Sequence, residues 1–241
     1  MKPGPVDDGR QASHVAFCSW GKASMTLRLV IVNKAYSSWS LRPWILMTHL
    51  NVPFEEAVIP MGQPDTRARI LEFSPTGKCP ALVDGEVVVW ESLAIVEYLA
   101  ETFPQLAIWP RDRAARAHAR ALSNEMHGGF QALRNHCPTQ FLRPVRKLAL
   151  TPEVEADVAR LEATWEGARA RFGAGGPFLF GEFGAADAMF APVVNRFHTY
   201  AIAVRPATRA YMDTVMALPA WKAWIAGAEG EPWRIDSYDA V

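Results

Sequence analysis

The sequence has few cysteines, no excess of charge of either sign and no long apolar run. Its three cysteines, Cys18, Cys79 and Cys137, are widely spaced and form neither a Cys-x-x-Cys pair nor a cysteine–histidine cluster. This pattern indicates neither a disulfide framework nor a metal site, and it fits a reducing cytoplasm. The 25 Lys and Arg residues balance the 25 Asp and Glu residues, which argues against nucleic-acid binding. No apolar stretch approaches the roughly 20 residues that span a bilayer, so no membrane contact is expected.

What the sequence does contain is an ordinary globular composition, with 50% hydrophobic and 21% charged residues. Its 241 residues suffice for one large domain or two small ones. Residues 1–25 contain proline and glycine and show no periodicity, and they lack the basic segment and apolar core of a signal peptide. We expect a flexible leader without a role in the chemistry, consistent also with a start assigned too far upstream.

The first half of the chain alternates short strand patterns with helical ones. LRLVIV, residues 27–32, is apolar and rich in β-branched residues, which favours a strand buried on both faces. The next helix should begin near Ser40, so that Pro43 falls in its first turn, where the missing N–H is harmless. Asp84-Gly85 is a strong signal for a tight turn between strands. The expected strands cover residues 27–32, 53–59, 81–84 and 86–90, and the expected helices cover residues 40–50, 66–73 and 93–103.

After residue 112 only helical patterns remain. The segment TFPQLAIWPRD, which contains two prolines, precedes them and predicts a linker at residues 105–111. The segment at residues 184–200 is apolar almost all round, which is typical of a helix inside a bundle. Helices are expected over residues 113–135 (broken or loosened at Gly128-Gly129), 152–172, 184–200, 206–216 and 219–228. The sequence therefore predicts an α/β thioredoxin-like domain, residues 26–104, followed by an all-α helical bundle domain, residues 112–241.

Several motifs occur along this pattern in a characteristic order. They are SPTGKCPAL before Asp84, the helix start Glu91-Ser92-Leu-Ala-Ile, and Ala186-Asp187 in the buried helix. Together with the order of elements, they resemble the soluble glutathione transferases over residues 26 to about 228. The turn YSSWSLRPW is similar to that of the bacterial zeta-like branch of the family, which reads Ser-Ser-x-Ser-x-Arg.

The resemblance implies that glutathione binds to two of these motifs. Pro80 would follow a cis bond, so that the backbone of Cys79, next to Lys78, pairs with the cysteinyl part of glutathione like an added strand. Ser92, at a helix N-terminus suited to a carboxylate, would hold the γ-glutamyl carboxylate, with Glu91 near the ammonium group. The alternatives are a proline that only begins a strand and a serine that only caps its helix.

The turn that carries Tyr36, Ser37 and Ser38 should activate the thiol of the bound glutathione. A free cysteine thiol has a pKa of about 8.5, so only about 3% is thiolate at neutral pH. A hydroxyl that donates a hydrogen bond to the sulfur favours the anion. The resemblance assigns this catalytic role to Ser37, with Ser38 as neighbour or substitute and Tyr36 as a third candidate. Plain turn chemistry remains an alternative.

The segment EMHGGFQALRNHCP is expected to line the cleft between the domains. The resemblance implies a pocket for the second substrate with Tyr36, Trp39, Met126 and Phe130 as walls and Arg134 attracting an anionic group. A solvated or dimer-facing surface is the alternative for this segment. His127 and His136 lack a third ligand, so no metal is expected there. Asp187 is expected to cap its helix together with Gly184, as a folding residue.

The resemblance thus implies a cytoplasmic, homodimeric glutathione transferase that uses glutathione as co-substrate to detoxify a small electrophile. A zeta-type glutathione-dependent cis-trans isomerase is the nearest alternative on the same fold. A noncatalytic glutathione-binding or stress-response module and a thiol reductase acting through Cys79 are further alternatives. The identity of the electrophile is not encoded in the generic apolar residues expected around it.

Overall fold

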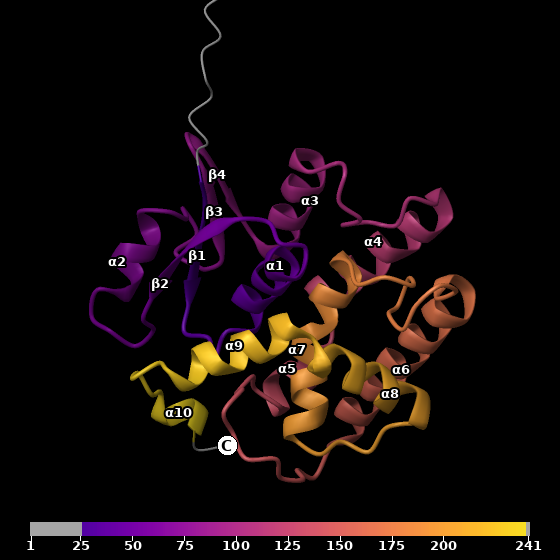
Figure 1. Cartoon of the computed structure of the whole chain (residues 1–241). Helices are drawn as coiled ribbons and strands as arrows, with labels where there is room; N and C mark the ends of the chain where they lie inside the picture. Colours follow the sequence, from indigo (N-terminus) through magenta and orange to yellow (C-terminus); the bar gives the residue numbers. More distant parts are fainter. Residues whose placement is uncertain (1–25, 240–241) are drawn as a thin grey trace, which may run out of the picture.

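A sheet layer with three helices lies beside a larger group of helices (Figure 1). This computed structural model describes residues 26–239 of the chain, and the expected leader at residues 1–25 lies outside the described residues. The order of elements in the first part is β-α-β-α-β-β-α. This order and the all-helical second part confirm the expected fold class.

The sheet has four strands in the order β2-β1-β3-β4. β1 pairs in parallel with β2 and antiparallel with β3, and β3 pairs antiparallel with β4. All residues of β1 except Arg28 are buried, as its continuous apolar sequence predicts for an inner strand. Gly85, with φ of +60°, makes the tight turn between β3 and β4. The strands are β1 (Leu27–Val32), β2 (Phe54–Ile59), β3 (Ala81–Asp84) and β4 (Val87–Trp90).

Three helices belong to the sheet layer: α1 (Ser38–His49), α2 (Thr66–Leu71) and α3 (Ser92–Thr102). α1 begins two residues earlier than predicted, because Ser37 caps it: the Ser37 Oγ accepts a hydrogen bond from the Ser40 N–H at 3.1 Å. Pro43 consequently lies inside the helix, and its expected place in the first turn is wrong.

The second part is built around one buried helix, α7 (Ala185–Thr199). Every residue of α7 from Ala185 to Phe197 is buried, which confirms the prediction from its apolar sequence. The expected break at Gly128-Gly129 is also confirmed, since it separates α4 from α5. The short α10 was not predicted. The other helices are α4 (Arg113–Gly128), α5 (Gln131–His136), α6 (Pro152–Phe172), α8 (Pro206–Ala217), α9 (Pro219–Glu229) and α10 (Asp236–Asp239).

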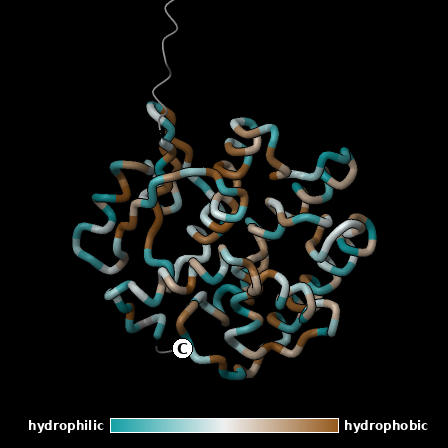
Figure 2. Tube along the Cα trace, viewed as in Figure 1, coloured by the Kyte–Doolittle hydropathy of each residue, from teal (hydrophilic) through white to brown (hydrophobic). Residues whose placement is uncertain are grey.

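One hydrophobic core extends through both parts. α1 packs against α7 and α9, and the rings of Trp44 and Trp224 meet edge to face with centroids 5.1 Å apart. Figure 2 shows hydrophobic stretches along the strands of the sheet that faces these helices. The two parts therefore hold a fixed position relative to each other, and residues from both can form one site. Within residues 26–239, no helix combines the length and apolarity required to cross a membrane.

Candidate functional site

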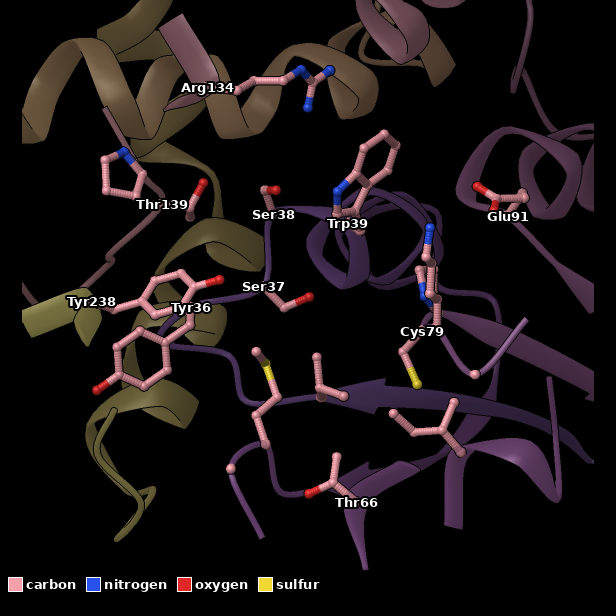
Figure 3. A pocket seen from close by; sticks show the side chains of 18 of the residues that line it. Tyr36, Ser37, Ser38, Trp39, Thr66, Cys79, Glu91, Arg134, Thr139 and Tyr238 are labelled. Carbon is pink, nitrogen blue, oxygen red and sulfur yellow. The ribbon is translucent and has the colours of Figure 1, made fainter. Parts of the chain in front are cut away.

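A pocket of about 700 Å³ lies between the two parts (Figure 3). The β1–α1 turn, the turn before β3 and the residue before α3 contribute from the sheet layer, and α5, the segment after it and α10 contribute from the other side. Many of the residues singled out in the sequence meet here. Those lining the pocket are Tyr36, Ser37, Ser38, Trp39, Lys78, Cys79, Pro80, Glu91 and Arg134.

Ser37 and Ser38 both present hydroxyls to the pocket, but with different partners. The Ser37 Oγ accepts from the Ser40 N–H and donates to the Ser40 Oγ at 2.9 Å. In Figure 3 it lies on the side of Cys79, whereas Ser38 lies toward Thr139 and Arg134. Because a hydroxyl proton rotates freely, Ser37 can turn its donor to a bound sulfur and still accept from the helix N–H.

Tyr36 turns its hydroxyl away from the pocket toward the C-terminal segment. The phenol donates to the Asp239 carboxylate at 3.1 Å and accepts from the Ile235 N–H at 3.1 Å. Burial is the main cause that raises the pKa of Tyr36. Its ring lines the pocket, but its hydroxyl is engaged elsewhere, which weakens it as a partner for a thiol.

The Cys79–Pro80 peptide bond is cis, as the resemblance implied. The bond lies at the turn that enters β3, so the backbone of Cys79 forms part of the pocket wall. Burial raises the pKa of the Cys79 thiol to about 12. At neutral pH this thiol is protonated, and it therefore lacks the thiolate character that a reductase needs.

Glu91 and Ser92 occupy different environments at the start of α3. Glu91 has a left-handed backbone with φ of +71°, lines the pocket and places its carboxylate 3.6 Å from Nε2 of His127 in α4. Ser92 is fully buried and is absent from the pocket lining; its Oγ lies 3.5 Å from Nη1 of Arg42. Glu91 thus reaches across to the helical part, and Ser92 sits one layer deeper than expected.

Arg42 is a buried cation behind Ser92. Its Nε and Nη2 atoms have no hydrogen-bond partner within residues 26–239. Burial, together with the charges of Arg134 and Arg196, lowers the pKa of Arg42 well below its ordinary value. The guanidinium stacks on the Trp39 ring at 4.1 Å. A bound anion near the start of α3 would compensate this charge, since a buried charge is costly without a partner.

The expected walls for a second substrate are only partly present. Trp39 and Arg134 line the pocket, with the guanidinium of Arg134 5.0 Å from the Trp39 ring centroid. Met126 and Phe130 instead belong to the hydrophobic core. Met126 lies in α4, which packs against α7, and Phe130 lies in the turn between α4 and α5. The Arg134 side chain also donates to the Gly129 carbonyl at 2.9 Å, which holds it in place.

The pocket residues that sequence reasoning missed include Thr139, Arg196 and Tyr238. Thr139 is buried and its hydroxyl has no partner in the described part of the chain. Burial lowers the pKa of Arg196 to about 10. No sequence signal points to these residues, because they reach the β1–α1 turn only through long-range contacts.

Asp187 lies outside the pocket and has a structural role. Its carboxylate accepts hydrogen bonds from the Gly184 N–H at 3.1 Å, the Leu179 N–H at 3.1 Å and the Tyr211 hydroxyl at 3.0 Å. Burial raises the pKa of Asp187 to about 6. The expected pairing of Asp187 with Gly184 is confirmed. In residues 26–239, no group of three or more His, Cys, Asp or Glu side chains is arranged to hold a metal ion.

Comparison with known proteins gives a consistent result for both parts. Residues 36–102 match the family described as "Glutathione S-transferase, N-terminal domain", and residues 151–227 match "Glutathione S-transferase, C-terminal domain". A "Probable maleylacetoacetate isomerase" of Caenorhabditis elegans is 40% identical over 100 residues, which cover 41% of this chain and 46% of that protein. The "Glutathione S-transferase zeta class" of Euphorbia esula is 33% identical over 110 residues, covering 44% and 49%.

The aligned regions span less than half of the length of these two relatives. A third relative, a "Dichloromethane dehalogenase" of Methylorubrum extorquens, is 42% identical over only 65 residues, which cover 26% of this chain and 23% of that protein. Solved structures align over more of the chain. A glutathione transferase homolog from Burkholderia with bound glutathione has a TM-score of 0.67 at 22% identity, covering 86% of this chain and all of that one. A diazinon-metabolizing glutathione S-transferase of the silkworm Bombyx mori has a TM-score of 0.67 at 16% identity, covering 85% and 98%.

Proposed function

Because this chain belongs to the glutathione transferase family, we propose that it joins the thiolate of glutathione to a small electrophile in the pocket between its two parts. The observation that carries the proposal is the meeting of Ser37, the turn at Cys79 and Pro80, and Glu91 in one pocket. These groups come from three separate segments of the chain, and each would contact a different part of glutathione.

Glutathione would lie along the sheet side of the pocket. The backbone of Cys79 pairs with its cysteinyl part, and Lys78 lies beside the same turn. The γ-glutamyl carboxylate would approach the N-terminus of α3. Behind it lie the buried Ser92 and Arg42, whose Nε and Nη2 have no hydrogen-bond partner in the described residues, and this cation favours an anion there. Glu91, which lines the pocket, would meet the γ-glutamyl ammonium group. The binding groups thus match the charges of glutathione.

Ser37 is the preferred group for stabilising the thiolate. Its hydroxyl faces the side of the pocket that holds Cys79. It can give up its hydrogen bond to the Ser40 Oγ and donate to the sulfur of glutathione instead. Ser38 is the alternative, since its hydroxyl has no partner in the described structure but lies nearer Thr139. The electrophile would lie toward Trp39 and Arg134.

A zeta-type isomerase is the second candidate, and the nematode relative called "Probable maleylacetoacetate isomerase" favours it. In that reaction the thiolate adds to a double bond, the bond rotates and glutathione leaves again. The two activities differ in one measurable quantity, because an isomerase regenerates glutathione and a conjugating enzyme consumes it.

Calorimetric titration with glutathione, followed by an assay of glutathione consumption with a set of electrophiles, tests the proposal. We expect saturable binding and loss of free thiol that depends on the electrophile. Binding without any turnover would favour a noncatalytic module, and absence of binding would rule out both enzymatic functions.

We also propose that the protein is a cytoplasmic homodimer that serves detoxification, with the domain limits given by the sequence, residues 26–104 and 112–241. The scarcity of cysteine supports the cytoplasm. The dimer is supported by β4, which pairs with β3 on one side only. Its Val87, Val88 and Trp90 side chains are 46%, 37% and 40% exposed, an apolar edge that a second copy can cover.

A further inference from the structure

The turn between β1 and α1 ends at Ser37, the serine proposed to activate the thiol. The Asn33 carbonyl closes this turn from within, because it accepts hydrogen bonds from the Tyr36 N–H at 3.2 Å and the Ser37 N–H at 3.0 Å. The N–H groups of Lys34 and Ala35, which lie between them, bond instead to a group outside the turn. All five residues are buried, so these two amides need a partner from the protein.

The outside partner is Glu231, two residues beyond the last residue of α9. Its carboxylate accepts hydrogen bonds from the Lys34 N–H at 2.8 Å and the Ala35 N–H at 3.4 Å, and the residue is only 7% exposed. Hydrogen bonds to an ionised acceptor are stronger than those between neutral groups. The C-terminal end of α9 is thereby joined to the backbone that leads into Ser37.

The last turns of α9 fit closely against the same stretch of backbone. A Cβ atom added at Gly227 would lie 2.7 Å from Cδ of Lys34, so the Lys34 side chain runs directly over the helix. The Lys34 ammonium group pairs with the Glu56 carboxylate. It also lies 5.6 Å from the ring centroid of Trp44 and 5.7 Å from that of Trp224. The side chain and the backbone amide of Lys34 are therefore both held, and α9 meets the turn in a defined position.

Other segments hold the remaining polar groups of the turn. The Ala35 carbonyl accepts from the Phe141 N–H at 2.8 Å, and the Asn33 Oδ1 accepts from the Met61 N–H at 2.6 Å. Glu231 lies behind the turn, outside the lining of the pocket. An effect of Glu231 on the reaction must therefore pass through the position of the turn or through the charge of the carboxylate.

We propose that Glu231 is a positioning residue for thiol activation: its carboxylate holds the β1–α1 turn so that the Ser37 hydroxyl meets the sulfur of glutathione. The inference rests on the proposed function and adds to it a residue that touches neither glutathione nor the electrophile. A hydroxyl favours the thiolate only when its O–H points at the sulfur within hydrogen-bond distance. Without the carboxylate, two buried amides lose their acceptor, and the turn shifts to find another. Ser37, two residues after Ala35, shifts with it.

The pKa of the glutathione thiol in its complex with the protein tests this role, because the thiolate absorbs ultraviolet light that the thiol does not. For Glu231→Ala we expect this pKa to rise by about one unit, less than the loss of the Ser37 hydroxyl would cause. The thiolate fraction, and kcat/KM for benzyl chloride with it, should fall about threefold near neutral pH, while the affinity for glutathione changes less than about twofold. The sign is diagnostic: a carboxylate that acted through its charge alone would disfavour the thiolate, and its removal would lower the pKa.

Two further variants separate positioning from a loss of folding. Glu231→Gln keeps an oxygen for the Lys34 N–H in a side chain of the same size, so we expect a smaller rise in the thiol pKa. If Glu231→Ala does not fold, the rise in Glu231→Gln decides alone. In a double variant with Ser37→Ala, Glu231→Ala should raise the thiol pKa no further than Ser37→Ala does by itself, because both changes remove one contact.

Glu162→Ala is the matched control. Glu162 in α6 is 8% exposed, and its carboxylate accepts from the Arg205 N–H at 2.7 Å outside the pocket, so its loss also leaves a backbone amide without its acceptor. The thiol pKa should be unchanged in this variant. An unchanged or lowered thiol pKa in the Glu231 variants, an equal rise in Glu162→Ala, or a further rise in the double variant would overturn the inference, while consumption of glutathione by the wild-type protein would leave the proposed function intact. A wild-type protein that binds no glutathione would overturn both.

Discussion

At the β1–α1 turn, three successive hydroxyls have three different tasks. Tyr36 holds the C-terminal segment, Ser37 caps α1, and Ser38 faces the pocket without a partner in the described structure. A helix cap requires the Ser37 oxygen as an acceptor and leaves its proton available. Capping and activation of the thiol are therefore compatible in one residue.

Ser37→Ala should raise the pH needed for conjugation. If the hydroxyl lowers the thiol pKa by about two units, its loss reduces the thiolate fraction at neutral pH about 25-fold. The rate should fall by a similar factor near neutral pH and approach that of the wild-type protein about two pH units higher. The pH dependence of kcat/KM with benzyl chloride measures this, alongside the affinity for glutathione, which should be largely retained.

Ser38→Ala is the matched control, since it removes a neighbouring hydroxyl of the same pocket and leaves the Ser37 cap of α1 in place. We expect its pH profile to follow that of the wild-type protein. A shifted profile in Ser38→Ala together with an unshifted one in Ser37→Ala would move the activating role to Ser38.

Cys79→Ser should retain conjugating activity within about twofold. The thiol has its pKa raised to about 12 by burial, so it is protonated at neutral pH and its chemistry is not used. The backbone of the turn, which is proposed to bind glutathione, is kept in the variant. Assays of conjugation and of disulfide reduction provide the measurement; loss of both with intact glutathione binding would support a thiol reductase instead.

Sequence motifs located most of the site residues, but not how each of them lies. Ser37 from the turn motif, Cys79 from SPTGKCPAL and Glu91 from the helix start all line one pocket. The motifs carry no information about which way a side chain turns: Met126 faces the core and Tyr36 faces α10. Tyr238 was missed because no local pattern encodes a contact between two distant ends of the chain.

At the level of elements, the buried N-terminus of α7 depends on one carboxylate. Burial raises the pKa of Asp187 from 3.8 to about 6, so between these values the folded protein binds more protons at this site than the unfolded chain. Its contribution to the free energy of unfolding therefore falls as the pH rises from about 4 to about 6, and stays low above. Two pKa units correspond to roughly 3 kcal/mol, at about 1.36 kcal/mol each.

Asp187→Asn should remove this pH dependence, because the amide does not titrate. We expect the free energy of unfolding of the wild-type protein, relative to that of the variant, to fall by roughly 2 kcal/mol between about pH 4 and pH 7. Denaturant unfolding at both pH values measures it. Tyr211→Phe provides a second test: the Tyr211 hydroxyl lowers the pKa of Asp187, so its loss should move the transition to higher pH. A constant difference between wild type and Asp187→Asn would contradict the prediction.

Helices with a strong local signal were predictable to within a residue or two, as for α6, which begins with Thr151 as cap and Pro152 as first residue. The start of α1 was less predictable, because Ser37, Ser38 and Ser40 are all suitable caps and only the contacts in the folded protein select Ser37. α10 has four residues and no periodicity to detect. It exists through tertiary contacts to Tyr36 and Gln140.

For the whole molecule, the sheet has two unlike edges. β2 at one edge carries charged side chains, including Glu55 and Glu56, and charge discourages pairing with another chain. β4 at the other edge exposes Val87, Val88 and Trp90. An apolar edge strand left open promotes uncontrolled association, so we expect this edge to be covered in a defined dimer.

Val87→Glu should dissociate the proposed homodimer, because it places a charge in the apolar interface of both copies. Light scattering coupled to size exclusion should give the wild-type protein twice the chain mass of 26.7 kDa and the variant the mass of one chain. Val145→Glu is the matched control: Val145 is 55% exposed but lies far along the chain, in the helical part, and its variant should remain dimeric. A monomeric wild-type protein, or dissociation by Val145→Glu alone, would show that the β4 edge is not the interface.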